Sequence, residues 1–571
     1  MSSDHDRFDV YDTTLRDGAQ QEGLALSVRD KLAILSLLDD LGVGYVEGGW
    51  PGAIPKDTDF FSQARGVRLR HAVLTAFGST RRAGTAVDAD PQVRALLDAG
   101  TEVVTLVAKA HSRHVELALR TTPAENLAMV ADTVAHLVAH GRRVFLDAEH
   151  FFDGYAADPA YAMSVLRAAA GSGAEVLVLC DTNGGMLPDD VTATVTAVRA
   201  ALGGDSADGA AGLHSADGAA GPSPGAVLGI HCHNDTGCAV ANTLAAVRAG
   251  AVHVQGTVNG YGERTGNADL TTVVADMELK WGRRVLPVGA LATLTHTAHA
   301  VAEVTAMAAH PRAPYVGASA FAHKAGLHAS AIRVDDSLYQ HVEPAAVGND
   351  RRMLVSEMAG RASVELKAAE LGVDVTGDHE LIGRVVARVK AAEAVGYAYD
   401  AADASFELLL RDEAGAPVTY CDVESWQVHT SSHTAGGADT GKSEAIVKLR
   451  TGDARSVAVG EGNGPVNALD SAIRSALGTV YPELAKLELI DFRVRILDSS
   501  HGTDAVTRAL VSTADERGSW TTVGVGANVV EASWEALFDG LRYGLLRQHV
   551  SPADRRARAD VAASRRRPPW R

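Results

Sequence analysis

Residues 8 to about 282 alternate eight short apolar runs with amphipathic stretches, and this alternation constrains the fold more than any other feature of the chain. The apolar runs, which are typical of β-strands, are 8–12, 44–48, 68–76, 101–109, 143–149, 175–182, 226–233 and 251–258. Several of the stretches between them open with Ser, Thr or Asp, which are favoured helix N-caps. Eight consecutive β-α units predict an α/β fold, a parallel (β/α)8 TIM barrel. An open doubly wound sheet is the alternative, but no G-x-G-x-x-G motif follows the first run.

The composition argues against several classes of protein. A chain of 571 residues is too long for one core, so we expect about two to four domains. The net charge of −18 argues against nucleic acid or an anionic membrane as a partner. No run approaches the ~18 apolar residues of a membrane span, the first residues lack the apolar core of a signal peptide, and four cysteines do not make a disulfide framework. We therefore expect a soluble, cytoplasmic protein with reduced thiols.

Polar side chains gather where the apolar runs stop. Arg16 and Asp17 follow the first run, and His231 and His233 end the seventh. The other polar residues at such positions are Asp12, Glu47, Lys109, Glu149, Asp181 and Thr182. Any one of them alone could cap a helix or lie in a loop. Together they form the pattern expected at the C-terminal face of a barrel, where active sites of this fold lie.

Asp17, His231 and His233 form a candidate metal site. Side chains alternate along a strand, so the two histidines point to one side and Cys232 points to the other, into the core. His-x-His alone would be explained equally well by two histidines with ordinary partners. The first, seventh and eighth strands are neighbours in a closed barrel, so Asp17 can add a carboxylate and Asn267, just past the eighth run, can add a carbonyl oxygen. Such a mixed set suits Mg²⁺ or Mn²⁺, with Zn²⁺ as the alternative.

Three residues supply groups for electrostatic and acid–base chemistry. Arg16 could form a plain ion pair with Asp17. Near a metal-bound oxygen, however, its guanidinium would stabilise the charge that develops when a carbonyl group is attacked. A metal ion beside an arginine is suited to activating a 2-oxo acid as an electrophile. Glu149 and His328 are the candidates for removing a proton from a carbon acid.

The rest of the chain divides by sequence pattern. We assign residues 1–284 to the barrel, 285–402 to helical linker subdomains and 403–550 to an α+β domain. Strand-like runs in this last part are 405–410, 445–450, 456–460, 489–497, 505–512 and 521–525. Gly460 and Gly524, 64 residues apart, each lie in a Val-Gly-x-Gly sequence before a helical pattern, which predicts an internal repeat.

Three stretches have the composition of flexible chain. Residues 203–225 and 430–443 are low-complexity insertions, and 551–571 form a basic tail. Such sequences bury too little apolar surface to offset the entropy of ordering, so we expect 203–225 to be a flexible insertion and the tail to be disordered.

Four motifs are specific enough to indicate a family. They are DTTLRDGAQQ at 12–21, HCHND at 231–235, GERTGNA at 262–268 and HKAGLH at 323–328. In this order they resemble the 2-isopropylmalate, homocitrate and citramalate synthase family. The family consists of acetyl-CoA-dependent Claisen condensing enzymes on a metal-bearing barrel, with a C-terminal domain that dimerises and binds an effector. The resemblance covers nearly the whole chain, and residues 462–468 and 496–503 match pieces of that regulatory domain.

Within the family, residues 48–57 and 147–154 resemble the citramalate synthase branch. That branch condenses pyruvate with acetyl-CoA and hydrolyses the thioester to (R)-citramalate and CoA, an acyltransferase reaction of isoleucine biosynthesis. The resemblance implies pyruvate and acetyl-CoA as substrates, a homodimer, and isoleucine as the expected effector.

The resemblance also implies roles for the candidate residues. Arg16 would polarise the keto oxygen, and Thr182 would hydrogen-bond the carboxylate of pyruvate. Glu149 and His328, the latter donated by the partner subunit, would transfer the proton of the acetyl methyl group. The implied metal ligands are Asp17, His231, His233 and Asn267. One departure is Ser330, which stands where some members have an acidic residue; if that acid orients the base, the surroundings of His328 differ here.

Three other functions would use some of the same residues. A 2-isopropylmalate or homocitrate synthase differs in the pocket for the 2-oxo acid side chain, a matter of roughly 1–3 kcal/mol per methylene. A lyase or aldolase of the same superfamily would use the same metal site, but the C-terminal repeat argues against it. A metal-bound amino-acid sensor would not require Arg16, Glu149 and His328, which are all present.

Overall fold

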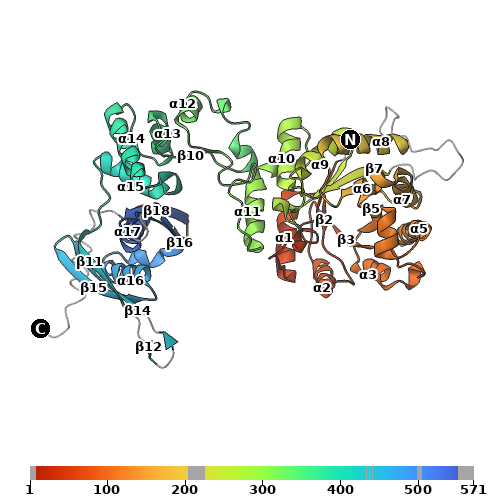
Figure 1. The fold of residues 1–571 in the computed structure, drawn as a ribbon, viewed down its shortest axis with the longest axis horizontal. Coiled ribbons are helices and arrows are strands. Elements are labelled where there is room, and N and C mark those ends of the chain that lie inside the picture. The colour runs from red at the N-terminus through yellow and green to blue at the C-terminus, as the bar shows by residue number, and fades with distance from the viewer. Residues whose placement is uncertain are drawn as a thin grey trace. The chain divides into compact units, whose positions relative to one another are not determined.

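The computed structural model describes residues 8–203, 226–431, 434–435, 438–439, 442–497 and 505–550 (Figure 1). The chain forms two compact units, Met1–Phe321 with Val342–Asp350, and Ala322–His341 with Arg351–Arg571. Apart from Gly203, the insertion predicted at 203–225 lies outside the described residues, as does the predicted tail 551–571, and the stretch 430–443 is described in part. None of the helices in these described ranges is long and apolar enough to cross a bilayer.

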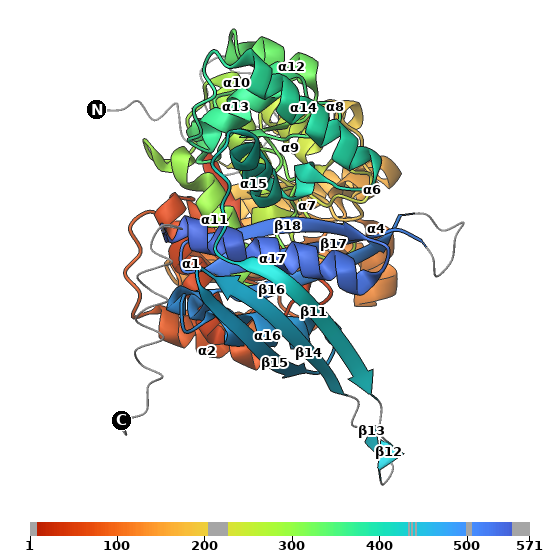
Figure 2. The same ribbon diagram turned by 90° about the vertical axis from the view of Figure 1, so that its left-hand side faces the viewer.

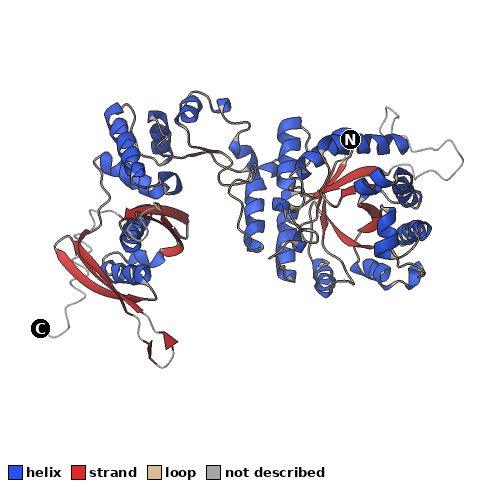
Figure 3. Cartoon of the chain, viewed as in Figure 1, coloured by secondary structure: helices blue, strands red, loops and turns tan. Residues whose placement is uncertain are grey.

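The first unit is built on a closed barrel of eight parallel strands, as the sequence predicts. Each strand pairs with the next in sequence, and β8 pairs with β1 through the register Asp9 to His253. The strands are β1 (Asp9–Asp12), β2 (Tyr45–Glu47), β3 (Val73–Ser79), β4 (Val103–Lys109), β5 (Arg143–Glu149), β6 (Val176–Asp181), β7 (Val227–Cys232) and β8 (His253–Gly256). Figure 3 shows these strands with the helices around them.

Helices connect the strands and begin at the caps that the sequence supplies. Ser27 and Asp30 form a capping box at the start of α1, and Asp90 and Thr122 cap two later helices. The longer helices of this unit are α1 (Val28–Leu41), α2 (Pro55–Ala64), α3 (Pro91–Ala99), α5 (Pro123–Ala139), α6 (Phe151–Ala157), α7 (Pro159–Gly171), α8 (Pro188–Ala201), α9 (Ala239–Ala249), α10 (Leu270–Trp281) and α11 (Leu294–Val304).

The third strand begins later than predicted. Residues 68–72 precede β3 as a loop, although the apolar run was expected to start at 68. The carboxylate of Asp39 on α1 accepts hydrogen bonds from the backbone N–H groups of Arg70, His71 and Ala72 at 2.8–3.0 Å. These N–H groups are therefore taken by a side chain and not by a neighbouring strand.

The second unit carries a helical part and two similar α+β halves (Figure 2). The helical part contains α12 (Gly326–Ile332), α13 (Arg361–Glu370), α14 (His379–Ala394) and α15 (Asp403–Glu413), with a short parallel pair of β9 (Ala322–His323) and β10 (Arg352–Met353). The first half is β11 (Asp422–Ser431), β14 (Lys442–Thr451), β15 (Ala454–Gly462) and α16 (Pro465–Leu477). The second half is β16 (Glu488–Ile496), β17 (Thr507–Asp515), β18 (Gly518–Gly526) and α17 (Val529–Arg547). Short strands β12 (Thr434–Ala435) and β13 (Ala438–Asp439) pair between β11 and β14.

The predicted internal repeat is confirmed, and both halves share one close contact between strand and helix backbones. Each half is a three-stranded antiparallel sheet with one helix against it. A Cβ at Gly460 would lie 2.3 Å from the N atom of Ala472, and one at Gly524 would lie 2.7 Å from the N atom of Ala536. Strand and helix backbones therefore touch at corresponding positions, 64 residues apart.

The strand predicted at 405–410 is wrong, because these residues belong to helix α15. Phe406, Leu409 and Leu410 pack into one core cluster, whereas Leu408 packs into another. A helix buried on two sides has an apolar pattern that resembles a buried strand. The sequence also gave no prediction for β11, most of whose residues are exposed.

Candidate active site

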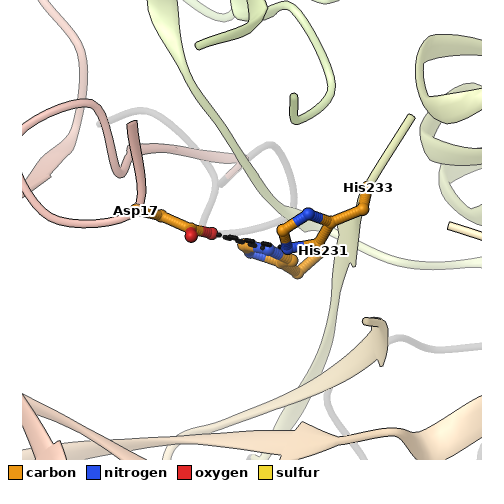
Figure 4. A group of neighbouring side chains, drawn as sticks. All are labelled: Asp17, His231 and His233. Carbon is orange, nitrogen blue, oxygen red and sulfur yellow. Dashed lines mark ion pairs between the residues drawn. The ribbon is translucent and has the colours of Figure 1, made fainter. Parts of the chain in front are cut away.

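Asp17, His231 and His233 meet at the C-terminal end of the barrel (Figure 4). Asp17 lies in a turn just after β1, His231 near the end of β7, and His233 just beyond it. The Nε2 atoms of His231 and His233 lie 3.1 and 3.7 Å from the same carboxylate oxygen of Asp17, Oδ2. All three side chains are buried, and one donor atom from each lies within 4.8 Å of the others. The structure thus brings together the three residues that the sequence singled out.

His231 is held by a hydrogen-bond chain that sequence reasoning missed. Its Nδ1 lies 2.9 Å from Oε1 of Gln255, and Nε2 of Gln255 donates to Oδ1 of Asp147 at 2.9 Å. Because the Gln255 oxygen can only accept, Nδ1 of His231 carries the proton and donates it. Second contacts of this kind fix the ring of a metal-binding histidine. Gln255 and Asp147 could have been suspected, since each interrupts an apolar strand with a polar residue.

Asn267 lies beside His233 through an isolated backbone bridge. Its amide nitrogen donates to the carbonyl of Tyr261 at 3.1 Å, while its buried Oδ1 has no hydrogen-bond partner among the described residues. A side chain on Gly262 would lie 2.2 Å from this amide, so a glycine is needed there. A buried amide oxygen without a partner, on a residue whose backbone is bridged to that of His233, is compatible with a divalent cation, because such oxygens are metal ligands.

The charged groups in this cluster shift one another's pKa values. Burial opposes ionisation of Asp17, yet Arg16 and the two histidines hold its pKa well below the usual range. Burial lowers the pKa of His231, but its contact with Asp17 more than offsets this and raises it above the ordinary value. Burial and the neighbouring His231 lower the pKa of His233 to about 4. His233 is therefore neutral near pH 7 and has a lone pair to offer.

Arg16 is fixed by a buried carboxylate below it. Its Nε lies 2.5 Å from Oε1 of Glu47, whose other oxygen accepts a hydrogen bond from Tyr11 at 2.7 Å. Its guanidinium lies 3.8 Å from the ring centroid of Phe77, and its Nη1 lies 3.7 Å from Asp17. Burial lowers the pKa of Arg16, but Glu47 and Asp17 raise it overall, so the charge is permanent. The arginine is thus a rigid cation beside the candidate metal site.

A cavity of about 580 Å³ opens above these residues. Arg16, Glu149 and Thr182 line it together with Asp17, His231 and His233. Glu149 forms an ion pair with Lys109. The hydroxyl oxygen of Thr182 accepts a hydrogen bond from the backbone N–H of His150 at 2.8 Å, so its own proton is available to another acceptor.

His328 lies in the second unit, on α12, and its relation to the barrel site stays a prediction. Its ring stacks on Tyr339 with centroids 4.1 Å apart. Ser330, the residue that departs from the family pattern, donates to the carbonyl of Gly326 at 2.9 Å in its own helix. Tyr339 was not singled out from the sequence, because it is one aromatic residue outside any motif.

Comparison with known proteins places the chain in a family. Residues 7–301 match the HMGL-like family model, 315–396 the homocitrate synthase post-HMGL domain-like model, and 400–545 the LeuA allosteric (dimerisation) domain. The chain is similar to the (R)-citramalate synthase of Streptomyces coelicolor, with 60% identity over 96% of this chain and 98% of that protein. The chain belongs to the 2-isopropylmalate, homocitrate and citramalate synthase family.

Two further members of the family span the same length. An (R)-citramalate synthase from Synechocystis is 46% identical over 94% of this chain and 96% of that protein. A probable 2-isopropylmalate synthase from Methanopyrus kandleri is 30% identical over 94% of this chain and 98% of that protein. The family resemblance predicted from the four motifs is confirmed.

Proposed function

We propose that this chain is an (R)-citramalate synthase, an acyltransferase that condenses acetyl-CoA with pyruvate. The observation that carries the proposal is the similarity, at 40–60% identity over almost the full length, to several (R)-citramalate synthases. The barrel site supports it, because a cation site, a fixed arginine and a carboxylate line one cavity. The reaction forms a carbon–carbon bond between the acetyl methyl carbon and the keto carbon of pyruvate, and water then cleaves the thioester to release CoA.

The proposed cofactor is a divalent cation, Mg²⁺ or Mn²⁺ with Zn²⁺ as the alternative. Its proposed ligands are Asp17, His231, His233 and Asn267. When bound, the cation acts as a Lewis acid on the 2-oxo group. Gln255 accepts the Nδ1 proton of His231, so that Nε2 is the nitrogen that faces Asp17 and would bind the cation after losing its proton. A mixed oxygen and nitrogen set does not by itself select among these metals.

The remaining proposed roles belong to residues around the cavity. Arg16 stabilises the negative charge on the keto oxygen, because its guanidinium is held in place by Glu47 before substrate arrives. Thr182 donates its free hydroxyl proton to the carboxylate of pyruvate. Glu149, with His328 of the partner subunit, takes the proton from the acetyl methyl group. Because Glu149 lines the cavity with Arg16, base and electrophile face the same space.

The second unit supports a regulatory role. Residues 400–545 match the LeuA allosteric (dimerisation) domain, and the two halves repeat the same strand and helix order. We therefore propose a homodimer, with isoleucine as its effector. Light scattering measures the dimer, and inhibition of CoA release by isoleucine, with leucine and valine as controls, tests the effector.

Thiol release from acetyl-CoA tests the main proposal. The enzyme is assayed with Mg²⁺ or Mn²⁺ on pyruvate, 2-oxobutyrate, 2-oxoisovalerate and 2-oxoglutarate. We expect the highest kcat/KM on pyruvate. Preference for 2-oxoisovalerate would make it a 2-isopropylmalate synthase, and preference for 2-oxoglutarate a homocitrate synthase. No CoA release with any of them would contradict the condensation function and favour a lyase or a sensor.

A further inference from the structure

Arg264 joins three loops at the mouth of the cavity. It lies in the loop after β8 and lines the cavity. Its Nε and Nη2 donate to the two carboxylate oxygens of Asp235, at 2.8 and 3.0 Å, in the loop after β7. The same Nη2 donates to the backbone carbonyl of Thr182 at 2.8 Å, in the loop after β6. One guanidinium thus bridges the ends of three consecutive strands, with the two parallel bonds to a carboxylate that arginine alone can make.

Each of the three loops carries a residue with a proposed role. Thr182 itself is the proposed ligand of the substrate carboxylate, His233 lies two residues before Asp235, and Asn267 lies three residues after Arg264. Backbone bonds join the same loops, because the N–H of Asn234 donates to the carbonyl of Gly266 at 2.9 Å. A displacement of Arg264 would therefore reach both the substrate anchor and two proposed metal ligands.

The local backbone is adapted to this contact. Arg264 has a φ of 57°, in the left-handed region where glycine is favoured and other residues are strained. Across from it, a Cβ at Gly184 would lie 2.4 Å from Oδ2 of Asp235, so a glycine makes room for the carboxylate. The chain thus has an arginine in a strained conformation at a position where a glycine would fit. It has a glycine at position 184, where a side chain would displace Asp235.

The contribution of an exposed ion pair to protein stability does not by itself account for this arrangement. Arg264 and Asp235 have side-chain exposures of 42% and 27%, and ion pairs of such exposure usually stabilise a protein little. We propose that Arg264, with Asp235, is a positioning residue. It holds Thr182, His233 and Asn267 at the relative positions that binding of the 2-oxo acid and the metal ion requires. This inference rests on the proposed condensation function.

The test uses full-length Arg264→Lys, Arg264→Gly and Asp235→Asn variants. The lysine keeps the charge but not the paired bonds, and the glycine removes the side chain while relieving the backbone. Arg143→Lys is the matched control, because its Nε makes a 2.9 Å ion pair with Glu175 at the opposite ends of the strands. The measurements are KM and kcat for pyruvate and for acetyl-CoA, Mn²⁺ affinity of the free protein by electron paramagnetic resonance, and Tm.

We expect the three variants to lose about ten-fold or more in kcat/KM for pyruvate, since small misplacements of a positioning group are costly. Mn²⁺ affinity falls about ten-fold, as for other residues that orient metal ligands. The KM for acetyl-CoA and the Tm of Arg264→Gly stay near wild type, and Arg143→Lys changes neither pyruvate kinetics nor Mn²⁺ affinity.

Two results overturn the inference: wild-type pyruvate KM and Mn²⁺ affinity in Arg264→Gly and Asp235→Asn, or equal losses in the Arg143→Lys control. Failure of the proposed function is a separate result. It would show as no CoA release by the wild-type enzyme, and in that case the Mn²⁺ titrations still decide whether Arg264 positions His233 and Asn267.

Discussion

Nδ1 of His231 lies 2.9 Å from Oε1 of Gln255, and this contact decides which nitrogen of the ring faces Asp17. Gln255→Leu removes the acceptor, so the proton is free to move to Nε2 and the ring is free to turn. We expect Mn²⁺ affinity to fall about 10- to 100-fold. Electron paramagnetic resonance titration measures it. Gln63→Leu, at an exposed position on α2, is the control, and equal affinity of the two variants would contradict the role of Gln255.

Asp12 gives the barrel a pH-dependent stability. Burial raises the pKa of this carboxyl to about 7, against hydrogen bonds from Thr14 that lower it. The folded state therefore holds a proton that the unfolded state loses near pH 4, and stability from this group falls as the pH rises from about 4 to 7. Asp12→Asn cannot titrate, so its stability relative to wild type should rise across this window, by up to about 4 kcal/mol. Tm values at pH 5 and 8 measure the difference, and a gap that does not change with pH would contradict the assignment.

Lys31 and Asp57 form a buried ion pair that anchors the loop after β2. Lys31 also donates to the carbonyl of Gly48, and Asp57 accepts from the backbone N–H of Trp50 at 2.8 Å. Lys31→Met leaves the Asp57 charge buried without its partner, so we expect a loss of about 3–5 kcal/mol in the free energy of unfolding. Urea unfolding measures the loss, and Lys31→Met with Asp57→Asn should recover most of it.

The matched control for this pair is Arg70→Met. Arg70 pairs with Asp40 at the surface, with both side chains more than half exposed, and its Nε lies at the longer distance of 3.8 Å from Asp39. We expect a change within about 1 kcal/mol there. Equal losses at Lys31 and Arg70 would mean that burial does not set the strength of these pairs.

His328 should affect the proton-transfer step and not substrate binding. We expect His328→Asn to lower kcat about 10²- to 10⁴-fold, as for loss of a general acid or base, with Mn²⁺ affinity unchanged. Mixing His328→Asn with Arg16→Gln chains tests where the histidine acts. Recovery of activity in the hybrid dimers would place His328 in the partner's site, whereas no recovery would mean that both residues act within one chain.

The sequence predicted the barrel because strand period and helix caps agree over the whole first part of the chain. It located Asp17, His231 and His233 because strand ends converge in a closed barrel. It missed Gln255 and Asp147, which stand out as polar residues in apolar strands but whose partners across the barrel no local pattern shows. It also missed Tyr339, which belongs to no motif. The start of β3 was misplaced because residues 70–72 bond the carboxylate of Asp39, which lies far away in the sequence. Residues 405–410 were predicted as a strand because helix α15 is buried on two sides, and burial on two sides is not encoded in the neighbouring residues.

Barrel closure also sets an order of events in folding. Asp17 follows the first strand, His231 ends the seventh, and β8 pairs with β1 through Asp9 and His253. More than 200 residues separate Asp17 from the two histidines, so the donor set is absent from any intermediate in which the first and last strands have not met. The moment at which Mn²⁺ first binds tightly during refolding would therefore report when the barrel closes, independently of helix formation.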